Sequence, residues 1–320
     1  MGTACAAIIG CGNIGSRHLQ SMVRSDRIAE IWVVEPNQKA RALALSRAKE
    51  IGVNGRRVEF VDAVGGLPSR IDLAVLATSS VERRRTFDDL VAAKGVGAII
   101  FEKFLFPCLG DYADVSRSLA KLAVPGWVNC PRRVWPGYRD VRANFHGRAN
   151  VIMRETGSSW GLASNAVHLL DTYTFVTGHA VTAVSADALE AGGAASKRPG
   201  YIEVFGTLRA TGPSGSVELT CYRSGALPRL IEFVCPETRV LIDEKAGTAT
   251  WTLRGGAPAT RSFATLPVSA SQVVFDDILM TGTCGLPSFA ESTSEHELVL
   301  NAIGGHTGVN IQANEPCLIT

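Results

Sequence analysis

The sequence lacks any apolar run of the roughly 18 to 20 residues that a membrane-spanning helix needs. Its N-terminus lacks the charged segment followed by a long apolar segment that is typical of a secretory signal. The 32 Lys and Arg against 30 Asp and Glu leave a formal net charge of only +2, and no basic block is long enough to follow a phosphate backbone. We therefore expect a cytoplasmic protein that binds neither membranes nor nucleic acid.

The eight cysteines include no C-x-x-C pair and no clustered histidine partners at zinc spacing. We expect them to be reduced and mostly buried, and we expect no metal site. The one basic cluster, Arg83-Arg84-Arg85, is interpreted as a solvated helix face, with contact to a phosphate or acidic ligand as the alternative.

Length and composition indicate a folded protein of two domains. The chain has 320 residues, and a typical domain has about 150. Hydrophobic residues make up 46% and charged residues 19%, values typical of globular proteins. Because prolines and arginines appear near residues 124–136, we place a boundary near Gly126. This predicts a dinucleotide-binding domain at 1–126 and a substrate-binding and oligomerisation domain at 127–320.

The first domain alternates short apolar segments with helical patterns. The expected strands lie at 5–9, 31–34, 58–61, 72–77 and 97–101, and helices are expected after residue 15, at 38–51 and at 81–94. This alternation predicts an α/β fold with a doubly wound parallel sheet of the Rossmann type.

The second half of the chain is rich in extended segments. Strands are expected at 151–155, 181–189, 201–210, 216–222, 230–235, 240–243 and 249–253, with helices at 161–178 and 288–304 and a flexible loop at 192–200. We therefore predict an α+β domain with a large, open, mostly antiparallel sheet. Because such a sheet exposes apolar area that needs covering, we expect a homodimer or homotetramer formed through it.

A glycine motif lies between the first strand and the first helix. Gly10 permits a tight turn, Gly12 lets the backbone approach a pyrophosphate, and Gly15 allows close helix packing; Asn13 and Ile14 complete the turn. The free amides and the helix dipole then face the phosphates, and a plain glycine turn is the alternative reading.

The second strand ends in a carboxylate that bears on the choice of cofactor. Glu35 follows Gly15 by 20 positions, where it can accept hydrogen bonds from ribose hydroxyls and would repel a 2′-phosphate. The cofactor predicted is NAD. Lys39 and Arg41 keep NADP as the alternative, because either could reach a phosphate.

Polar residues follow the fourth and fifth strands at the edge where open α/β sheets bind ligands. Thr78 and Ser79 are expected to line the nicotinamide side, and Glu102 to join the cofactor-binding set. Lys103 is the candidate general acid/base, since its ammonium could exchange a proton with a substrate oxygen or polarise a carbonyl. An ordinary solvent-exposed lysine is the alternative.

A polar stripe interrupts the apolar helix expected at 161–178. Its members share one side of the helix and are Ser164, Asn165, His168, Asp171 and Thr172. Beside a strand-end lysine this stripe would form a cleft with acid, base and hydrogen-bonding groups. A histidine with a purely structural role is the alternative for His168.

Taken in order, several features resemble the glucose-fructose oxidoreductase, inositol dehydrogenase and rhizopine-catabolism (Gfo/Idh/MocA) family nearly from end to end. They are the 10–15 turn followed by Arg17-His18, Ala77-Thr78, Glu102-Lys103, residues 129–138, the His168 helix and residues 286–289. The resemblance implies a Rossmann domain, a C-terminal domain whose open sheet often serves oligomerisation, a nicotinamide cofactor between them, and hydride transfer at a carbohydrate-like hydroxyl.

The family's Glu-Lys-Pro motif carries over to catalytic Lys103, and its helical histidine carries over to His168. The family aspartate falls at Ser164, so that carboxylate is lost, although Asn165 could hold a substrate hydroxyl. The family proline falls at Phe104, which removes the low-cost cis option, and we expect the Lys103 loop to run differently. A histidine common after the fourth strand falls at Arg83.

Arg132, Arg133 and Tyr138 lie in a segment that resembles the family's substrate-side entry to the second domain. Paired arginines suit a carboxylate or phosphate, so an acidic or nucleotide-linked sugar is expected to bind there. A surface or interdomain salt bridge is the alternative.

The function predicted is NAD(P)-dependent hydride transfer between nicotinamide and a hydroxyl or carbonyl of a sugar, sugar derivative or polyol. Lys103 is expected to be the general acid/base and His168 to orient the hydroxyl or assist proton transfer, with Ser164, Asn165 and Thr172 also binding substrate. Both catalytic side chains are expected to converge on the nicotinamide ring. Two alternatives stay open: an NAD-dependent glycosidase that acts by transient oxidation, and a catalytically silent protein that senses dinucleotide or sugar.

Overall fold

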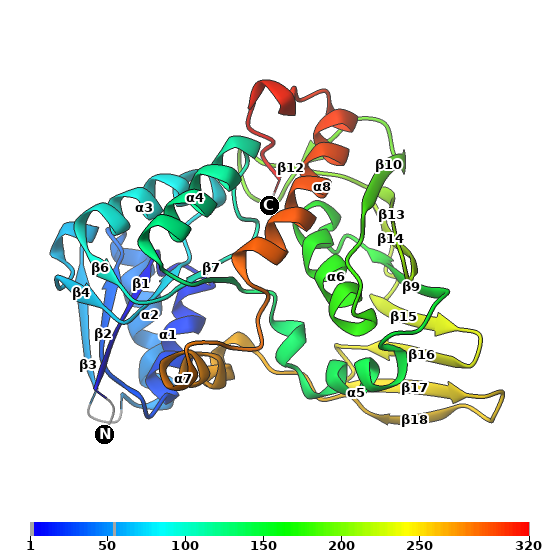
Figure 1. Ribbon diagram of the computed structural model, residues 1–320, viewed down its shortest axis with the longest axis horizontal. Helices are drawn as coiled ribbons and strands as arrows, with labels where there is room; N and C mark the ends of the chain where they lie inside the picture. The colour runs from blue at the N-terminus through cyan, green and yellow to red at the C-terminus, as the bar shows by residue number, and fades with distance from the viewer. Residues whose placement is uncertain (1–2, 54–55, 320) are drawn as a thin grey trace. The chain divides into compact units, whose positions relative to one another are not determined.

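The computed structural model describes residues 3–53 and 56–319 (Figure 1). By its contacts the chain divides into two compact units. The first comprises residues 1–106, 111–131 and 266–290, and the second comprises residues 107–110, 132–265 and 291–320. The first unit therefore includes a segment near the C-terminus in addition to the N-terminal part of the chain.

The first unit contains a parallel six-stranded sheet in the order β3-β2-β1-β5-β7-β8. Its strands are β1 (Ala4–Ile9), β2 (Ile28–Val34), β3 (Arg57–Val61), β5 (Leu73–Leu76), β7 (Ile99–Phe101) and β8 (Gly126–Val128). Helices α1 (Gly15–Arg24) and α2 (Gln38–Ile51) lie on one face of the sheet, and α3 (Ser80–Ala93) and α4 (Leu109–Leu122) lie on the other (Figure 1). This confirms the doubly wound Rossmann-type sheet.

Local chemistry explains several boundaries in this unit. The side chain of Asn37 caps α2 by accepting hydrogen bonds from the backbone N–H groups of Lys39 and Ala40. β5 begins one residue later than expected, since Asp72 turns its carboxylate to the N–H of Cys5 at 2.9 Å. Several elements of this unit were not predicted, α4 among them. The three-residue strand β8 is too short to show a pattern, and α7 (Gln272–Thr281) reaches α1 from a distant part of the chain.

The unit also contains small elements. These are β4 (Arg70–Ile71) paired with β6 (Gly95–Val96), and the short helices η1 (Val64–Gly66) and η3 (Val268–Ala270).

The second unit contains an eight-stranded sheet in the order β10-β13-β14-β9-β15-β16-β17-β18. All neighbours pair antiparallel except β14 and β9, so the predicted large, mostly antiparallel sheet is confirmed. The strands are β9 (Val151–Ser158), β10 (Ala183–Leu189), β13 (Gly206–Gly212), β14 (Gly215–Tyr222), β15 (Leu230–Cys235), β16 (Thr238–Asp243), β17 (Thr248–Leu253) and β18 (Ala259–Ser262).

The strand expected at 201–210 is two strands, β12 (Ile202–Glu203) and β13. Gly206 starts β13 at φ +99°, and a Cβ there would lie 2.6 Å from the carbonyl oxygen of Ala188. A side chain is therefore excluded at the break. β12 pairs with β11 (Ala194–Ala195), so part of the loop expected at 192–200 is extended.

The helices of the second unit are α5 (Pro136–Phe145), α6 (Leu162–Thr177) and α8 (Phe289–Thr307), with the short helices η2 (Pro131–Val134) and η4 (Ile311–Ala313). α6 packs against α5 and β14, and it is buried along most of its length. Gly161 and Gly178 bound it in left-handed conformations, at φ +83° and +84°.

The exposed face of the second sheet differs from the apolar surface that we expected. It carries an alternating row of arginines and glutamates, in which Arg154 lies 3.1 Å from Glu218 and 3.3 Å from Glu232, and Arg239 lies 2.5 Å from Glu232. The expectation that this sheet exposes apolar area is therefore wrong for this row of residues. The homodimer or homotetramer stays a prediction.

All eight cysteines are free thiols, five of them buried. Within the described part of the chain, no His, Cys, Asp and Glu side chains group so as to hold a metal ion. Searched over the same residues, the helices include none that is long and apolar enough to span a membrane.

Candidate functional site

The glycine turn joins β1 to α1 at the carboxyl edge of the parallel sheet. Gly10 has φ +85°, and a Cβ there would lie 2.9 Å from the backbone N of Thr78. A Cβ on Gly15 would lie 2.1 Å from the carbonyl oxygen of Gly10, whereas one on Gly12 meets nothing within 4 Å. Gly10 and Gly15 are thus needed for packing, and Gly12 faces open space at the N-terminus of a ten-residue helix. This arrangement suits a pyrophosphate.

Glu35 at the end of β2 is buried and fixed next to this turn. Its Oε2 accepts a hydrogen bond from the backbone N–H of Cys11 at 2.8 Å, and its Oε1 accepts one from Asn37 at 2.9 Å. Each carboxylate oxygen keeps a second acceptor site. Glu35 can therefore still accept hydrogen bonds from ribose hydroxyls.

Lys39 and Arg41, the two basic residues that left NADP as the alternative cofactor, have different surroundings in the structure. The Arg41 guanidinium lies 2.6 Å from Asp62 and donates to the carbonyl oxygen of Glu35. Lys39 is exposed and makes no ion pair among the described residues. Arg41 is therefore already neutralised, which favours NAD.

Glu102 and Lys103 follow β7 at the same edge of the sheet. Glu102 Oε1 lies 2.7 Å from His18 Nε2 and accepts a hydrogen bond from Asn129 Nδ2 at 2.6 Å. Burial alone would raise the pKa of Glu102, but the bonds from His18 and Asn129 and the charge of Arg83 outweigh it and hold the pKa below its ordinary value. Glu102 is thus a fixed negative charge beside half-buried Lys103.

Arg83 holds the loop that carries Lys103. The expectation of a solvated helix face is wrong for this residue, since Arg83 is only 2% exposed. Its guanidinium donates to the carbonyl oxygens of Thr78, Phe104 and Leu105, the last at 2.8 Å. The Lys103–Phe104 peptide bond is cis, so the loss of proline has not removed the cis form.

The polar residues of α6 differ in their surroundings. Ser164 and Asn165 line a cavity of about 450 Å³ at the start of the helix. Half-buried His168 lies one turn further along, and its carbonyl oxygen accepts the hydroxyl of fully buried Thr172 at 2.6 Å. The Thr172 hydroxyl is therefore satisfied within its own helix.

Asp171, the remaining member of the stripe, is fully buried and lies 2.7 Å from Arg133, which also contacts Glu291 at 3.3 Å. Burial and nearby Glu291 raise the pKa of Asp171 to about 6, despite the lowering effect of Arg133. Arg133 is thus engaged by carboxylates of its own unit.

Arg132 and Tyr138 share one protein carboxylate. Arg132 binds Glu244 through two hydrogen bonds of 2.6 and 2.9 Å, and the Tyr138 hydroxyl donates to the same carboxylate at 2.6 Å. Burial opposes ionisation of Glu244, but Arg132 and Tyr138 hold its pKa below the ordinary value. Glu244 thus fills the place that we expected a substrate anion to take, as in the salt-bridge alternative.

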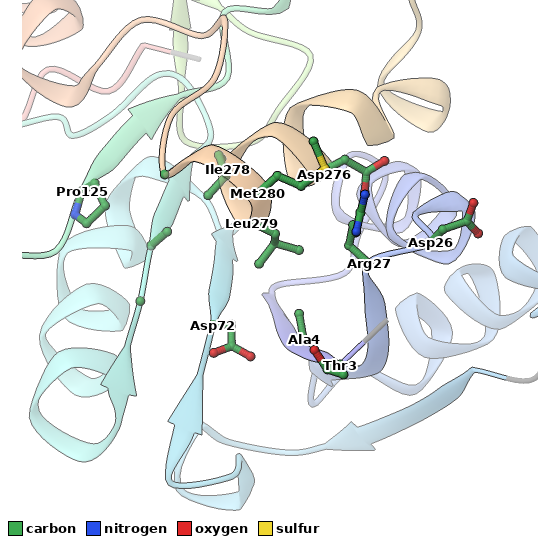
Figure 2. A pocket seen from close by; sticks show the side chains of 13 residues that line it. Thr3, Ala4, Asp26, Arg27, Asp72, Pro125, Asp276, Ile278, Leu279 and Met280 are labelled. Carbon is green, nitrogen blue, oxygen red and sulfur yellow. The ribbon is translucent and has the colours of Figure 1, made fainter. Parts of the chain in front are cut away.

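A second cavity, of about 1130 Å³, lies at the opposite edge of the first sheet (Figure 2). Its lining includes Ala4 at the start of β1, Asp72 just before β5 and Pro125 just before β8, together with α7 residues such as Asp276. Open α/β sheets bind their ligands at the carboxyl ends of the strands. This cavity is therefore not part of the candidate site.

The sequence matches no family model and no curated protein. Solved structures match over nearly the whole chain. UDP-N-acetylglucosamine 3-dehydrogenase GnnA from Acidithiobacillus ferrooxidans has a TM-score of 0.72 at 15% identity, over 97% of this chain and 98% of that one. The structure of scyllo-inositol dehydrogenase from Lactobacillus casei with NAD(H) and scyllo-inositol has a TM-score of 0.68 at 13% identity, over 94% and 96%.

An oxidoreductase from Agrobacterium radiobacter, in complex with NAD+, L-tartaric acid and magnesium, has a TM-score of 0.69 at 18% identity, over 97% of this chain and 99% of that one. These neighbours are Gfo/Idh/MocA-type dehydrogenases. This chain has their fold. The predicted resemblance is thereby confirmed at the level of fold.

The sequence did not predict the contacts of two polar residues, Arg83 and Glu203. Arg83 looked like one of three consecutive surface arginines, and no local pattern distinguishes it. Glu203 lies in β12 but accepts hydrogen bonds at the start of α6, from the N–H groups of Ala163 at 2.7 Å and Val204 at 3.0 Å. Only the folded chain brings these segments together.

One buried carboxyl group in the second unit, that of Glu295, is expected to make the stability of the protein depend on pH. Burial and the neighbouring Asp171 raise the pKa of Glu295 well above its ordinary value, and Thr174 donates to its Oε1 at 2.7 Å. A carboxyl group whose folded pKa is raised contributes stability at low pH that is lost as pH rises through that pKa. The Glu295→Gln variant, which cannot ionise, is expected to lose less stability with rising pH than the unmodified protein.

The free energy of unfolding in urea, measured from about pH 5 to about pH 9, checks this expectation. Glu82→Gln on α3 is the control, because it makes the same substitution at an exposed position. Equal pH slopes for the unmodified protein and Glu295→Gln would contradict the expected ionisation behaviour.

Proposed function

We propose that the protein is an NAD-dependent oxidoreductase that acts on a CH–OH group of a carbohydrate or polyol. The observation that carries this is the glycine turn, where Gly12 faces open space beside the fixed carboxylate of Glu35. The A. radiobacter and L. casei neighbours, whose structures contain NAD+ and NAD(H), support the cofactor. Named dehydrogenases of a nucleotide sugar and of an inositol support the substrate class.

The residues proposed to hold the cofactor all belong to the first unit. The backbone of Gly10, Gly12, Asn13, Ile14 and Gly15 would bind the pyrophosphate, and Glu35 would accept the ribose hydroxyls. Thr78, Ser79 and Glu102 follow β5 and β7 at the same edge and would border the nicotinamide. When bound, NAD supplies the hydride acceptor.

The chain's own part in the reaction is proton transfer. In the oxidative direction neutral Lys103 would accept the substrate hydroxyl proton at Nζ, and in the reductive direction its ammonium would donate one. Glu102 cannot serve as the acid, because its hydrogen bonds hold it ionised. His168 is proposed to orient the substrate hydroxyl or assist this transfer, and Ser164 and Asn165 to bind hydroxyls.

Incubation with NAD and a panel of sugars, acidic sugars and polyols tests the proposal. We expect at least one compound to generate NADH, seen as absorbance at the dihydronicotinamide band, and NAD to raise the melting temperature more than NADP does. Net NADH separates this function from a glycosidase that oxidises only transiently. A cofactor-induced shift without turnover of any compound would refute the dehydrogenase assignment.

A further inference from the structure

The cavity at the start of α6 draws its walls from separate segments of the second unit. Its volume of about 450 Å³ lies within the range of roughly 300 to 1,000 Å³ typical of small-molecule sites. Ser164 and Asn165 come from the start of α6, and Trp160 lies just before that helix. Lys197 and Arg198 come from the segment that joins β11 to β12, and Glu203 comes from β12. Such a space fits one sugar ring with a substituent.

One wall of the cavity gathers polar groups suited to hydroxyls. A Cβ placed on Gly161 would lie 3.1 Å from Asn165 Nδ2 and 3.4 Å from both Ser164 Oγ and Glu203 Oε2. An amide, a hydroxyl and a carboxylate thus surround one point. Asn165 Nδ2 already donates to the carbonyl oxygens of Trp160 at 3.0 Å and Gly161 at 2.8 Å. Asn165 Oδ1, the Ser164 hydroxyl and the Glu203 carboxylate can accept hydrogen bonds from the hydroxyls of a carbohydrate, and the Ser164 hydroxyl can also donate one.

The carboxylate of Glu203 binds the N-terminal turn of α6. Its Oε1 accepts from the backbone N–H of Ala163 in the first turn of α6, which is the positive end of the helix dipole. That carboxylate is therefore partly compensated by the helix.

Lys197 and Arg198 contrast with the other basic residues considered for substrate binding. Arg132 is paired with Glu244 and Arg133 with Asp171. Over residues 3–53 and 56–319, neither Lys197 nor Arg198 forms an ion pair; the Arg198 guanidinium lies 5.5 Å from the centre of the Tyr201 ring. Of these four cations, the two without an ion pair among the described residues are thus the two that line the cavity.

We propose that this cavity binds a carbohydrate carrying an anionic group, a carboxylate or a phosphate, and that Lys197 and Arg198 bind that group while Ser164, Asn165 and Glu203 bind hydroxyls. This rests on the function proposed above and names its substrate class. An ammonium and a guanidinium can form hydrogen-bonded ion pairs with an anionic group, which a neutral sugar cannot do. An anionic sugar is therefore expected to bind about tenfold or more tightly than its neutral parent.

Calorimetric titration of the full-length protein with NAD present tests this. Several aldoses are compared, each as the neutral sugar, its uronic acid and its phosphate ester, so that the two sources of anion are distinguished. We expect the acid or the ester of at least one aldose to bind more tightly, with an affinity that falls as salt is added. In the Lys197→Ala/Arg198→Ala variant this preference is expected to disappear.

The matched control is Arg139→Ala/Lys245→Ala, which removes the same charge from exposed residues of the second unit outside the cavity. It is expected to keep the preference. The proposal is overturned if no anionic sugar binds more tightly than its parent, or if the preference survives in Lys197→Ala/Arg198→Ala. NADH formation is measured separately. Turnover of neutral sugars alone would refute the anionic substrate class and support the dehydrogenase function. Anion-dependent binding without NADH formation would support the anionic ligand class and refute the dehydrogenase function.

Discussion

Replacement of Lys103 by alanine is expected to lower kcat by about 10²- to 10⁴-fold, which is the usual contribution of a positioned general acid or base. NAD affinity is expected to be unchanged, because the proposed cofactor contacts come from the glycine turn and Glu35. The side chain is half-buried and follows β7, so the substitution removes the ammonium without emptying the core.

Steady-state kinetics with a substrate that generates NADH measures this effect, and NAD titration of the same variant measures the cofactor affinity. Lys121→Ala on α4 removes an exposed lysine of the same unit and is expected to keep full activity. Full turnover in Lys103→Ala would remove Lys103 from the mechanism. Loss of NAD binding in that variant would instead indicate a structural role.

Alanine at Gly12 is expected to weaken NAD binding by about tenfold or more without unfolding the protein. A Cβ built on Gly12 has no protein atom within 4 Å beyond its chain neighbours, so the fold is expected to accept alanine there. The same methyl group would occupy the space where a pyrophosphate approaches the backbone. Affinity and stability are therefore expected to separate.

The control for this substitution is Gly65→Ala, since Gly65 also has open space around the position of a Cβ and belongs to η1, outside the 10–15 turn. Calorimetric titration with NAD and thermal unfolding are measured for both variants. Equal NAD affinity in Gly12→Ala and the unmodified protein would show that the dinucleotide does not contact this turn.

Much of the first unit could be predicted because its signals are local. The alternation of apolar strands with helices and the spacing of Gly10, Gly12 and Gly15 depend on short-range geometry, and the structure has the parallel sheet with this turn at its carboxyl edge. The β8 strand and the α7 helix escaped prediction because one is only three residues long and the other joins its unit from more than a hundred residues away.

The charged residues could not be assigned in the same way. Arg132 and Arg133 are adjacent in sequence, and both suited an anion, but each has a carboxylate partner distant in the chain, at Glu244 and Asp171. A buried charge needs a partner, and a sequence pattern does not show which distant carboxylate supplies it. No sequence pattern indicated a role for Lys197 and Arg198, although they line the cavity with Ser164 and Asn165.

The sequence by itself determined the alternation of strands and helices in the first unit, the parallel and antiparallel sheets and the glycine turn, because hydrophobic periodicity and glycine conformation act over a few residues. Tertiary structure alone decided which charges are neutralised, which carbonyl oxygens Arg83 binds, and that Glu203 brings a carboxylate to the first turn of α6. Those outcomes depend on distances between segments far apart in the chain, and such distances are fixed only when the core packs.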